Sequence, residues 1–181
     1  MNKNIFIAAI IVFLGYKIIN TKTKMFFDNI LAKYGTEKSD KFKKVFSALN
    51  TLPLSKTSLK LLLSQVLNET GVFSSLTHVF DLNNNASGII YTGSPGQKAN
   101  GATKGSKRMS IEGGYYAKFD TLNNWAKEYY RILNKGAMPL KATSPEDFAT
   151  RLKQNGYFTA PLSDYKKNLI FFHDYLTKSG L

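Results

Sequence analysis

A glycine-rich stretch, from about Asn83 to Phe119, interrupts a chain that is otherwise patterned for helices. Its glycines alternate with two short β-prone runs, at Ile89–Tyr91 and Tyr115–Tyr116. Glycine weakens helices and permits tight turns, so this stretch predicts a small hairpin lobe or a mobile loop rather than a helix. We therefore expect an α+β, mainly helical domain with a glycine-rich β-hairpin lobe over about residues 83–119.

Apolar residues recur at helical spacing on both sides of this lobe. They predict helices over Phe26–Tyr34, Phe42–Leu49, Ser58–Asn68, Leu122–Leu133 and Pro145–Asn155, and a last helix that begins at Ser163. Thr57 or Ser58 is the expected N-cap of the third helix, with Gly71 just past its end. Ser144 followed by Pro145 is a strong start signal. Trp125 and Tyr129 are expected in the core.

The N-terminus carries an apolar run from Ile5 to Tyr16, which Ile18 and Ile19 extend beyond Lys17. A helix over residues 5–19 would be about 22 Å long, short of the roughly 30 Å hydrocarbon core. An uncleaved membrane anchor, a cleaved signal peptide and a buried core helix all remain open. The absence of a small-x-small cleavage site favours the anchor. We expect residues 1–24 to form this segment, with membrane contact through residues 5–19, and residues 25–181 to form one domain.

The net charge and the lack of cysteine limit which ligands, metals and cofactors are expected to bind this chain. Lysine and arginine number 25 against 12 acidic residues, and the net charge of +13 favours encounter with an anionic polymer. The lysines are scattered and no nucleic-acid module is visible, so nucleic acid is not expected as the ligand. The chain has no cysteine and two histidines without metal-site spacing. Neither a metal nor a cofactor is expected.

Glu69 is the acid to examine, because it ends the most apolar predicted helix. Loss of hydration beside an apolar wall raises the pKa of a carboxyl, and the negative end of the helix dipole acts in the same direction. A carboxyl that keeps its proton near neutrality suits general acid catalysis of glycoside cleavage. The alternative interpretation is a solvated glutamate at a helix end.

Four segments together resemble glycoside hydrolase family 73, the cell-wall N-acetylglucosaminidases. These are Gln65–Ser75, with its Glu69-Thr70-Gly71 core, Asn84–Ile89, Ala117–Ala126 and Asn155–Leu169, which occur in the family's order and spacing. The resemblance implies a lysozyme-like fold whose cleft lies between a helical and a hairpin lobe. It also implies Glu69 as general acid and Tyr157 as a cleft tyrosine. Substrate-binding roles are implied for Asn84, Asn85 and Tyr165.

The sequence departs from the family where some members carry a second carboxylate. The stretch Thr103–Arg108 holds no acid, and Glu112 is the nearest substitute in the lobe. Asp81 and Asp120 are weaker candidates. Inverting water attack, a covalent route and cyclisation by a group of the substrate all stay open.

The expected function is a membrane-anchored peptidoglycan hydrolase that cleaves β-1,4 glycosidic bonds, of the N-acetylglucosaminidase type. Two alternatives to this function remain open. The first is a lytic transglycosylase or muramidase on the same fold, and the second is a catalytically silent wall-binding structural protein. A small anchored hydrolase without a separate wall-binding domain suits local wall penetration. A virion membrane is therefore one hypothesis for its location.

Overall fold

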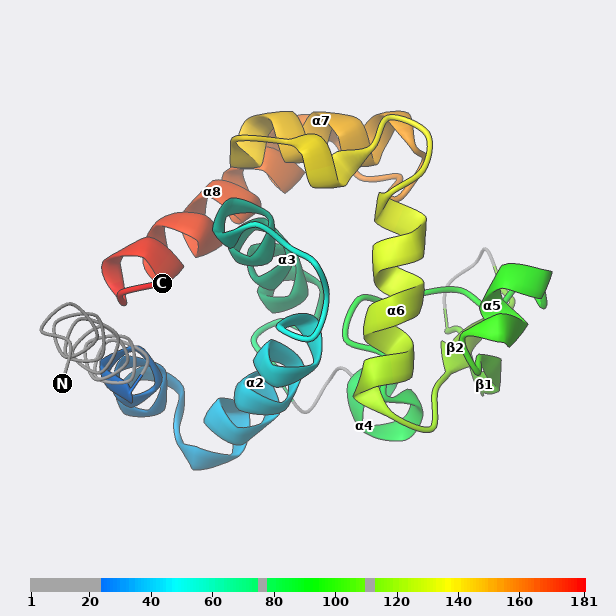
Figure 1. Cartoon of the computed structure of the whole chain (residues 1–181), viewed down its shortest axis with the longest axis horizontal. Coiled ribbons are helices and arrows are strands. Elements are labelled where there is room, and N and C mark those ends of the chain that lie inside the picture. Colours follow the sequence, from blue (N-terminus) through cyan, green and yellow to red (C-terminus); the bar gives the residue numbers. More distant parts are fainter. Residues whose placement is uncertain (1–23, 75–77, 110–112) are drawn as a thin grey trace, which may run out of the picture.

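The computed structural model describes residues 24–74, 78–109 and 113–181 (Figure 1). A first helix covers residues 24–34. The α-helices that follow are α2 (Thr36–Leu49), α3 (Lys56–Glu69), α4 (His78–Asn83), α5 (Pro95–Ala99), α6 (Leu122–Leu133), α7 (Pro145–Gln154) and α8 (Leu162–Lys178). A single 3₁₀ turn, η1 (Pro139–Lys141), joins α6 to α7, and β1 (Thr103–Lys107) pairs antiparallel with β2 (Tyr115–Lys118). The expected α+β, mainly helical class is confirmed.

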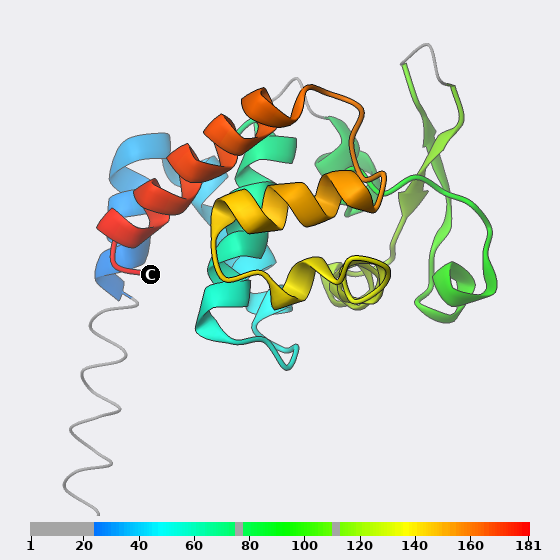
Figure 2. The same ribbon diagram turned by 90° about the horizontal axis from the view of Figure 1, so that it is seen from above.

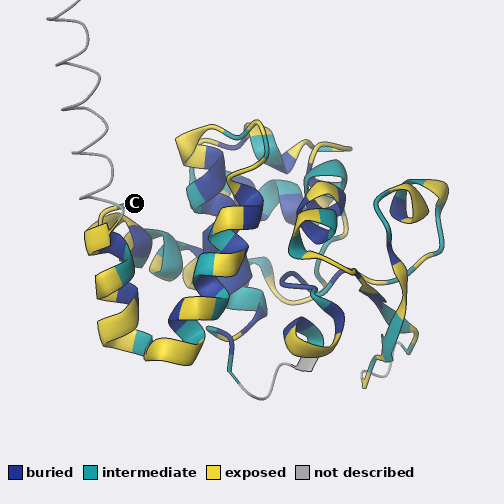
Figure 3. Cartoon of the chain, turned by 60° about the horizontal axis from the view of Figure 1, so that its bottom comes forward, coloured by how far each residue is buried: buried dark blue, intermediate teal, exposed yellow. Residues whose placement is uncertain are grey.

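Helix α3 is the centre of the helical lobe. Its leucines at positions 61, 62 and 63 are at most 1 % exposed, and residues 61–67 are all buried, so the middle of the helix is surrounded by protein. It packs against α8, which packs in turn against α7, while α2 packs against α6. Figure 3 shows buried positions concentrated inside the helical lobe and exposed positions on the outer faces of its helices. The position of α3 fixes where Glu69, its last residue, meets the surface.

The start of α3 corrects one expectation. Ser55 is the N-cap, and its Oγ accepts a hydrogen bond from the backbone N–H of Ser58 at 3.0 Å. Thr57 and Ser58 were the wrong caps because the helix begins earlier, at Lys56, and the Ser55 hydroxyl accepts a hydrogen bond from its first turn. Ser144 is confirmed as the cap of α7, with Pro145 in its first turn. Trp125 and Tyr129 are confirmed as fully buried core residues.

The hairpin lobe projects from the helical lobe (Figure 2). Thr103 pairs with Lys118 and Lys104 with Ala117, and an irregularity precedes the pairing of Lys107 with Tyr115. Ile90 adds an isolated bridge to Tyr116. The hairpin expected between residues 83 and 119 is confirmed in this part of the lobe.

The expectation that the glycine-rich stretch contains no helix is wrong at α5. Ser94 caps this helix by accepting a hydrogen bond from the N–H of Gln97 at 3.4 Å, and Pro95 lies in its first turn. The Gln97 side chain then accepts hydrogen bonds from the N–H groups of Thr92 and Gly93. Capping and side-chain bonds thus offset the poor helix propensity of Gly96.

The apolar run at residues 5–19 lies outside the described residues, so the membrane anchor stays a prediction. Within residues 24–74, 78–109 and 113–181, no helix is long and apolar enough to cross a membrane. The helix over residues 24–34 lies beside the C-terminal half of α8, and Asn29 donates a hydrogen bond to the carbonyl of Ser179 at 3.3 Å (Figure 1).

Candidate active site

A cleft of about 640 Å³ lies between the helical lobe and the hairpin lobe. The residues that line it come from α3 to α7 and from both strands or their ends: Glu69, Thr70, Val79, Phe80, residues 85–90, Thr92, Gln97, Arg108, Tyr116, Arg131, Ile132 and residues 155–157. The charged side chains in the described lining are Glu69, Arg108 and Arg131. Glu69 and Tyr157, which the sequence singled out, are therefore brought together in one cavity.

Glu69 sits where α3 ends in a left-handed turn. Gly71, Val72 and Phe73 follow with φ values of 51°, 57° and 54°, a conformation that is costly for a β-branched residue such as Val72. The turn is closed by a hydrogen bond from the N–H of Val72 to the carbonyl of Leu67 at 2.9 Å, and it buries Phe73 in the core. The chain thus leaves the helix abruptly and keeps the Glu69 carboxyl at the cleft wall.

The protonation of Glu69 is set by two opposing contributions. Burial removes water from the carboxyl and raises its pKa, as expected from the sequence. The hydroxyl of Tyr165 donates a hydrogen bond to Glu69 Oε1 at 2.6 Å, which stabilises the carboxylate and acts in the opposite direction. Burial dominates, so the carboxyl holds its proton to a higher pH than an exposed glutamate does. This is the state that a general acid requires.

A chain of hydrogen bonds fixes the direction in which Tyr165 donates. Tyr129 donates to Gln65 Oε1, and Gln65 Nε2 donates to the Tyr165 hydroxyl oxygen at 3.2 Å. Because that oxygen already accepts a bond, its own proton is directed to Glu69. Burial raises the pKa of Tyr129 and of Tyr165, so both hydroxyls keep their protons as donors.

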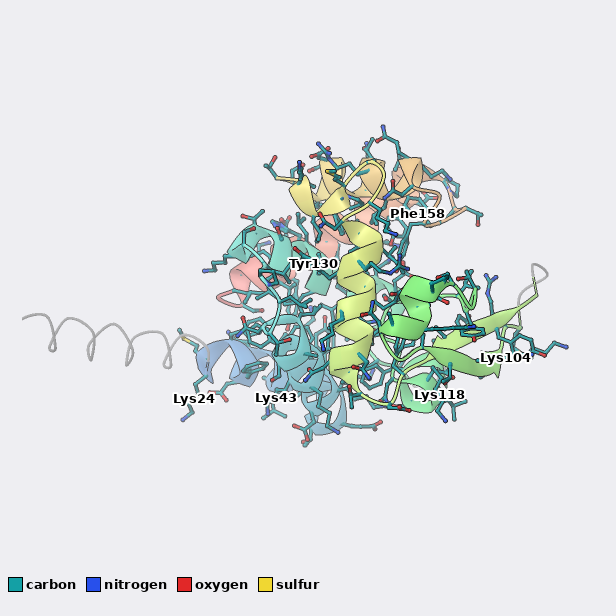
Figure 4. All side chains as sticks on the ribbon, turned by 45° about the vertical axis from the view of Figure 1, so that its right-hand side comes forward. Lys24, Lys43, Lys104, Lys118, Tyr130 and Phe158 are labelled. Carbon is teal, nitrogen blue, oxygen red and sulfur yellow. The ribbon has the colours of Figure 1, made fainter. Side chains whose placement is uncertain are left out.

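Phe158 holds the Tyr165 ring in place. The two rings stack with their centroids 3.7 Å apart and their planes inclined by 7°. Phe158 lies in the connection from α7 to α8 (Figure 4), while Tyr165 lies in the first turns of α8. The connection between these helices therefore positions the tyrosine that donates to the Glu69 carboxyl.

Ser87 ties the hairpin lobe to the helical lobe beside Glu69. Its carbonyl accepts a hydrogen bond from the Tyr157 hydroxyl at 2.7 Å, and its Oγ accepts one from the Trp125 indole at 3.0 Å. Burial, followed by the nearby charge of Glu69, raises the pKa of Tyr157. Tyr157 thus lines the cleft as expected, with its hydroxyl engaged by the protein.

Asn84 and Asn85 bond the lobe's own backbone. The buried Asn85 amide donates to the carbonyls of Ile89 and Ala117 at 2.8 and 2.9 Å, and Asn85 Oδ1 accepts from the N–H groups of Ile89 and Ser87. Asn84 adopts a φ of 48° and donates to the carbonyl of Phe119 at 2.9 Å. Asn85 lines the cleft, and both residues shape the turn that carries Ser87.

The partner carboxylate stays a prediction, because Glu112 lies outside the described residues. The two weaker candidates do not line the cleft. Asp81 forms an ion pair with Lys41 at 2.8 Å, and Asp120 is exposed beyond β2. In the part of the cleft that the structure describes, Glu69 is the only acidic lining residue.

No protein-family model, curated protein or solved structure matches this chain. The resemblance to glycoside hydrolase family 73 stays a prediction.

Sequence reasoning missed several residues that build this site. Gln65 precedes Glu69 by one helical turn, a spacing that places both on one face of α3 and signals contact. Glu128 and Arg131, three residues apart on α6, carry the same kind of signal. Ser87 gave no such signal, because its partners Trp125 and Tyr157 lie 38 and 70 positions away. Phe158 gave none because it lies in the connection before α8, outside any helical periodicity.

Proposed function

We propose that this chain is a peptidoglycan hydrolase with a lysozyme-like fold, which cleaves β-1,4 glycosidic bonds with Glu69 as general acid. The observation that carries the proposal is the partly buried Glu69 carboxyl at the cleft wall, whose pKa is raised by desolvation and which accepts a hydrogen bond from Tyr165 at 2.6 Å. Tyr165 occupies Oε1, so the proton for the substrate is carried by Oε2. The position of the acid between a helical and a hairpin lobe supports the lysozyme-like assignment.

The proposed reaction begins when Glu69 Oε2 protonates the glycosidic oxygen. The bond from that oxygen to the anomeric carbon breaks, and positive charge develops on the sugar ring. A nucleophile then attacks the anomeric carbon, and Glu69, now a carboxylate, accepts the proton that a water molecule loses. Where the substrate's own 2-acetamido oxygen attacks first, no second protein carboxylate is needed, which fits the single acid in the described lining.

The same observation supports a lytic transglycosylase as the second candidate. There the 6-hydroxyl of the muramic acid attacks its own anomeric carbon, Glu69 accepts the hydroxyl proton, and the product is a 1,6-anhydro sugar. We propose further that residues 5–19 hold the enzyme at a membrane next to the wall, whether that of a cell or of a virion. This location rests on the sequence pattern of the segment.

The test is digestion of purified peptidoglycan by the full-length chain, with products identified by mass spectrometry. Glu69→Gln keeps the oxygen that Tyr165 bonds and removes the transferable proton, so we expect turnover to fall to background. Glu37→Gln is the matched control, because Glu37 is an exposed carboxylate of α2 outside the cleft.

Each product pattern has a distinct meaning. New reducing ends at N-acetylglucosamine that depend on Glu69 support the glucosaminidase. Reducing ends at N-acetylmuramic acid support a muramidase, and anhydro-muramic ends support the transglycosylase. No release from walls that a control lysozyme digests would refute the enzyme and favour a silent wall-binding protein.

A further inference from the structure

An ion pair in the α6 helix fixes one guanidinium at the cleft. Glu128 is fully buried, and its two oxygens accept hydrogen bonds from Arg131 Nε at 2.7 Å and Nη2 at 2.5 Å. Asn100 adds a hydrogen bond to Glu128 Oε2 at 2.9 Å. The Arg131 side chain is 28 % exposed and lines the cleft that contains Glu69. A buried carboxylate therefore holds a cleft-lining cation in one orientation.

The bonds to Glu128 use only one edge of the guanidinium. Arginine carries five N–H donors, and the edge made by Nη1 and the second N–H of Nη2 matches another planar anion. In the part of the chain that the structure describes, Arg131 Nη1 forms no hydrogen bond. Arg131 thus presents a second, preorganised fork.

Gly96 of α5 leaves the space that this orientation needs. A Cβ at position 96 would lie 3.0 Å from Arg131 Cζ and Nε and 3.1 Å from Nη1. Any larger residue would push the guanidinium aside. The glycine and the buried carboxylate therefore act on the same group from two sides.

Among the described lining residues, Arg108 and Arg131 are basic and Glu69 is acidic, so these side chains together carry a positive charge when Glu69 is protonated. A neutral N-acetylglucosamine polymer offers no charged partner for the second fork of Arg131. Strands that contain muramic acid carry carboxylates, either on the lactyl group when it bears no peptide or on the stem peptide.

We propose that the second fork of Arg131 binds a carboxylate of the glycan and selects muramic-acid strands over neutral N-acetylglucosamine polymers. This inference rests on the proposed function for the identity of the glycan. It adds the part of the substrate that the cleft recognises and the residue that recognises it.

The test measures binding to the full-length chain with Glu69→Gln, so that no saccharide is consumed. Three tetrasaccharides are titrated by calorimetry: the neutral N-acetylglucosamine tetramer, the peptide-free tetramer with two muramic acids, and the same tetramer with stem peptides. We expect a charged tetramer to bind at least about tenfold more tightly than the neutral one, the effect of a charge-assisted hydrogen-bonded pair. The charged tetramer that binds more tightly than the neutral one shows whether the lactyl or the peptide carboxylate is the group that Arg131 binds.

Arg131→Lys, added to that chain, keeps a cation beside Glu128 and removes the second fork. We expect it to bind all three saccharides equally. Arg151→Gln is the control, because Arg151 pairs with Asp147 at 2.9 Å outside the cleft and its loss should leave the preference unchanged. If Arg131→Lys does not fold, the double substitution Glu128→Gln with Arg131→Gln leaves no buried unpaired charge and makes the same comparison.

Equal affinity of the Glu69→Gln chain for the three saccharides, or a preference that survives the added Arg131→Lys, would overturn the inference. The wild-type digestion assay separates this failure from failure of the proposed function. Wall digestion without discrimination refutes only the carboxylate site. Discrimination among the saccharides without wall digestion supports the carboxylate site and refutes the hydrolase. If the chain neither binds the saccharides nor digests the wall, both proposals are overturned.

Discussion

Glu69 combines partial burial with one short hydrogen bond from Tyr165, and this combination sets how it ionises. Desolvation favours the neutral acid, while Tyr165 favours the carboxylate. The donor cannot rotate away, because Gln65 bonds its oxygen and Phe158 stacks on its ring. Tyr165 therefore lowers the pKa of Glu69 from what burial alone would give, and it restrains the side chain at the same time.

Tyr165→Phe is expected to raise the pKa of Glu69 further, because it removes the hydrogen bond that lowers it. Activity that needs protonated Glu69 is lost as pH rises through that pKa, so the alkaline limb of the pH–rate profile should move to higher pH. The ¹³C shift of the Glu69 carboxyl, followed by NMR against pH, gives the same quantity without turnover. Tyr175→Phe, on the same helix but bonded to Asn29, serves as control. A lower or unchanged Glu69 pKa in Tyr165→Phe would contradict the role assigned to the hydroxyl.

Ionisation of Glu69 is also expected to cost stability. Its folded-state pKa lies above the ordinary value of 4.5, so between these two values the folded chain holds a proton that the unfolded chain has lost. The free energy of unfolding should fall as pH rises through this window and level off above it. Glu69→Gln should lack this component. The measurement is denaturant unfolding of both proteins across the acidic and neutral pH range. If the free energy of unfolding depends on pH in the same way for both proteins, folding does not raise the pKa of Glu69.

At the scale of elements, the turn over Asn85–Ile89 joins the two lobes. Asn85 satisfies backbone groups of this turn and of β2, and the turn presents Ser87 to Tyr157 and Trp125. One amide side chain thus connects a hairpin, a loop and the helical core. Its burial excludes water as a substitute partner.

Asn85→Ala is expected to destabilise the fold by several kcal/mol, because each buried backbone group left without a partner costs about 1–3 kcal/mol. The loss should appear first as faster amide hydrogen exchange at Ile89, whose N–H bonds Asn85 Oδ1 at 3.0 Å. Asn123→Ala, at an exposed position of α6, should have little effect. Unchanged exchange in Asn85→Ala would show that the turn is held by other contacts.

At the scale of the whole molecule, local signals predicted the helices and long-range packing built the site. Spacing and caps placed α6 and α7, because the residues that determine a helix lie within it. The donor chain to Glu69 joins Gln65 to Tyr165, 100 positions away, and no local pattern encodes that contact. The apolar helix and the resemblance both pointed to Glu69, and the resemblance also gave Tyr157 and Tyr165, but neither showed which hydroxyl would bond the carboxyl. The helix α5 was missed because the Ser94 cap and the hydrogen bonds of the Gln97 side chain offset the low helix propensity of this glycine-rich stretch.

The net charge of +13 predicts that wall binding weakens with salt, since exposed charges are screened beyond about 8 Å at physiological ionic strength. Co-sedimentation with purified anionic walls should fall steadily as sodium chloride rises. Lysines project from separate elements, among them Lys43 on α2 and Lys104 on β1 (Figure 4). Single replacements of these two by glutamine should each weaken binding slightly and alike. A large loss at one of them would instead indicate a local contact.

The hydrogen bonds of Tyr157 and Trp125 to Ser87 give the cleft a fixed aperture. A hinge motion of the hairpin lobe would have to break both bonds at once and leave buried donors without acceptors. A ligand must therefore fit the cleft at its present width, and steric tolerance rather than closure of the hairpin lobe limits which molecules reach Glu69.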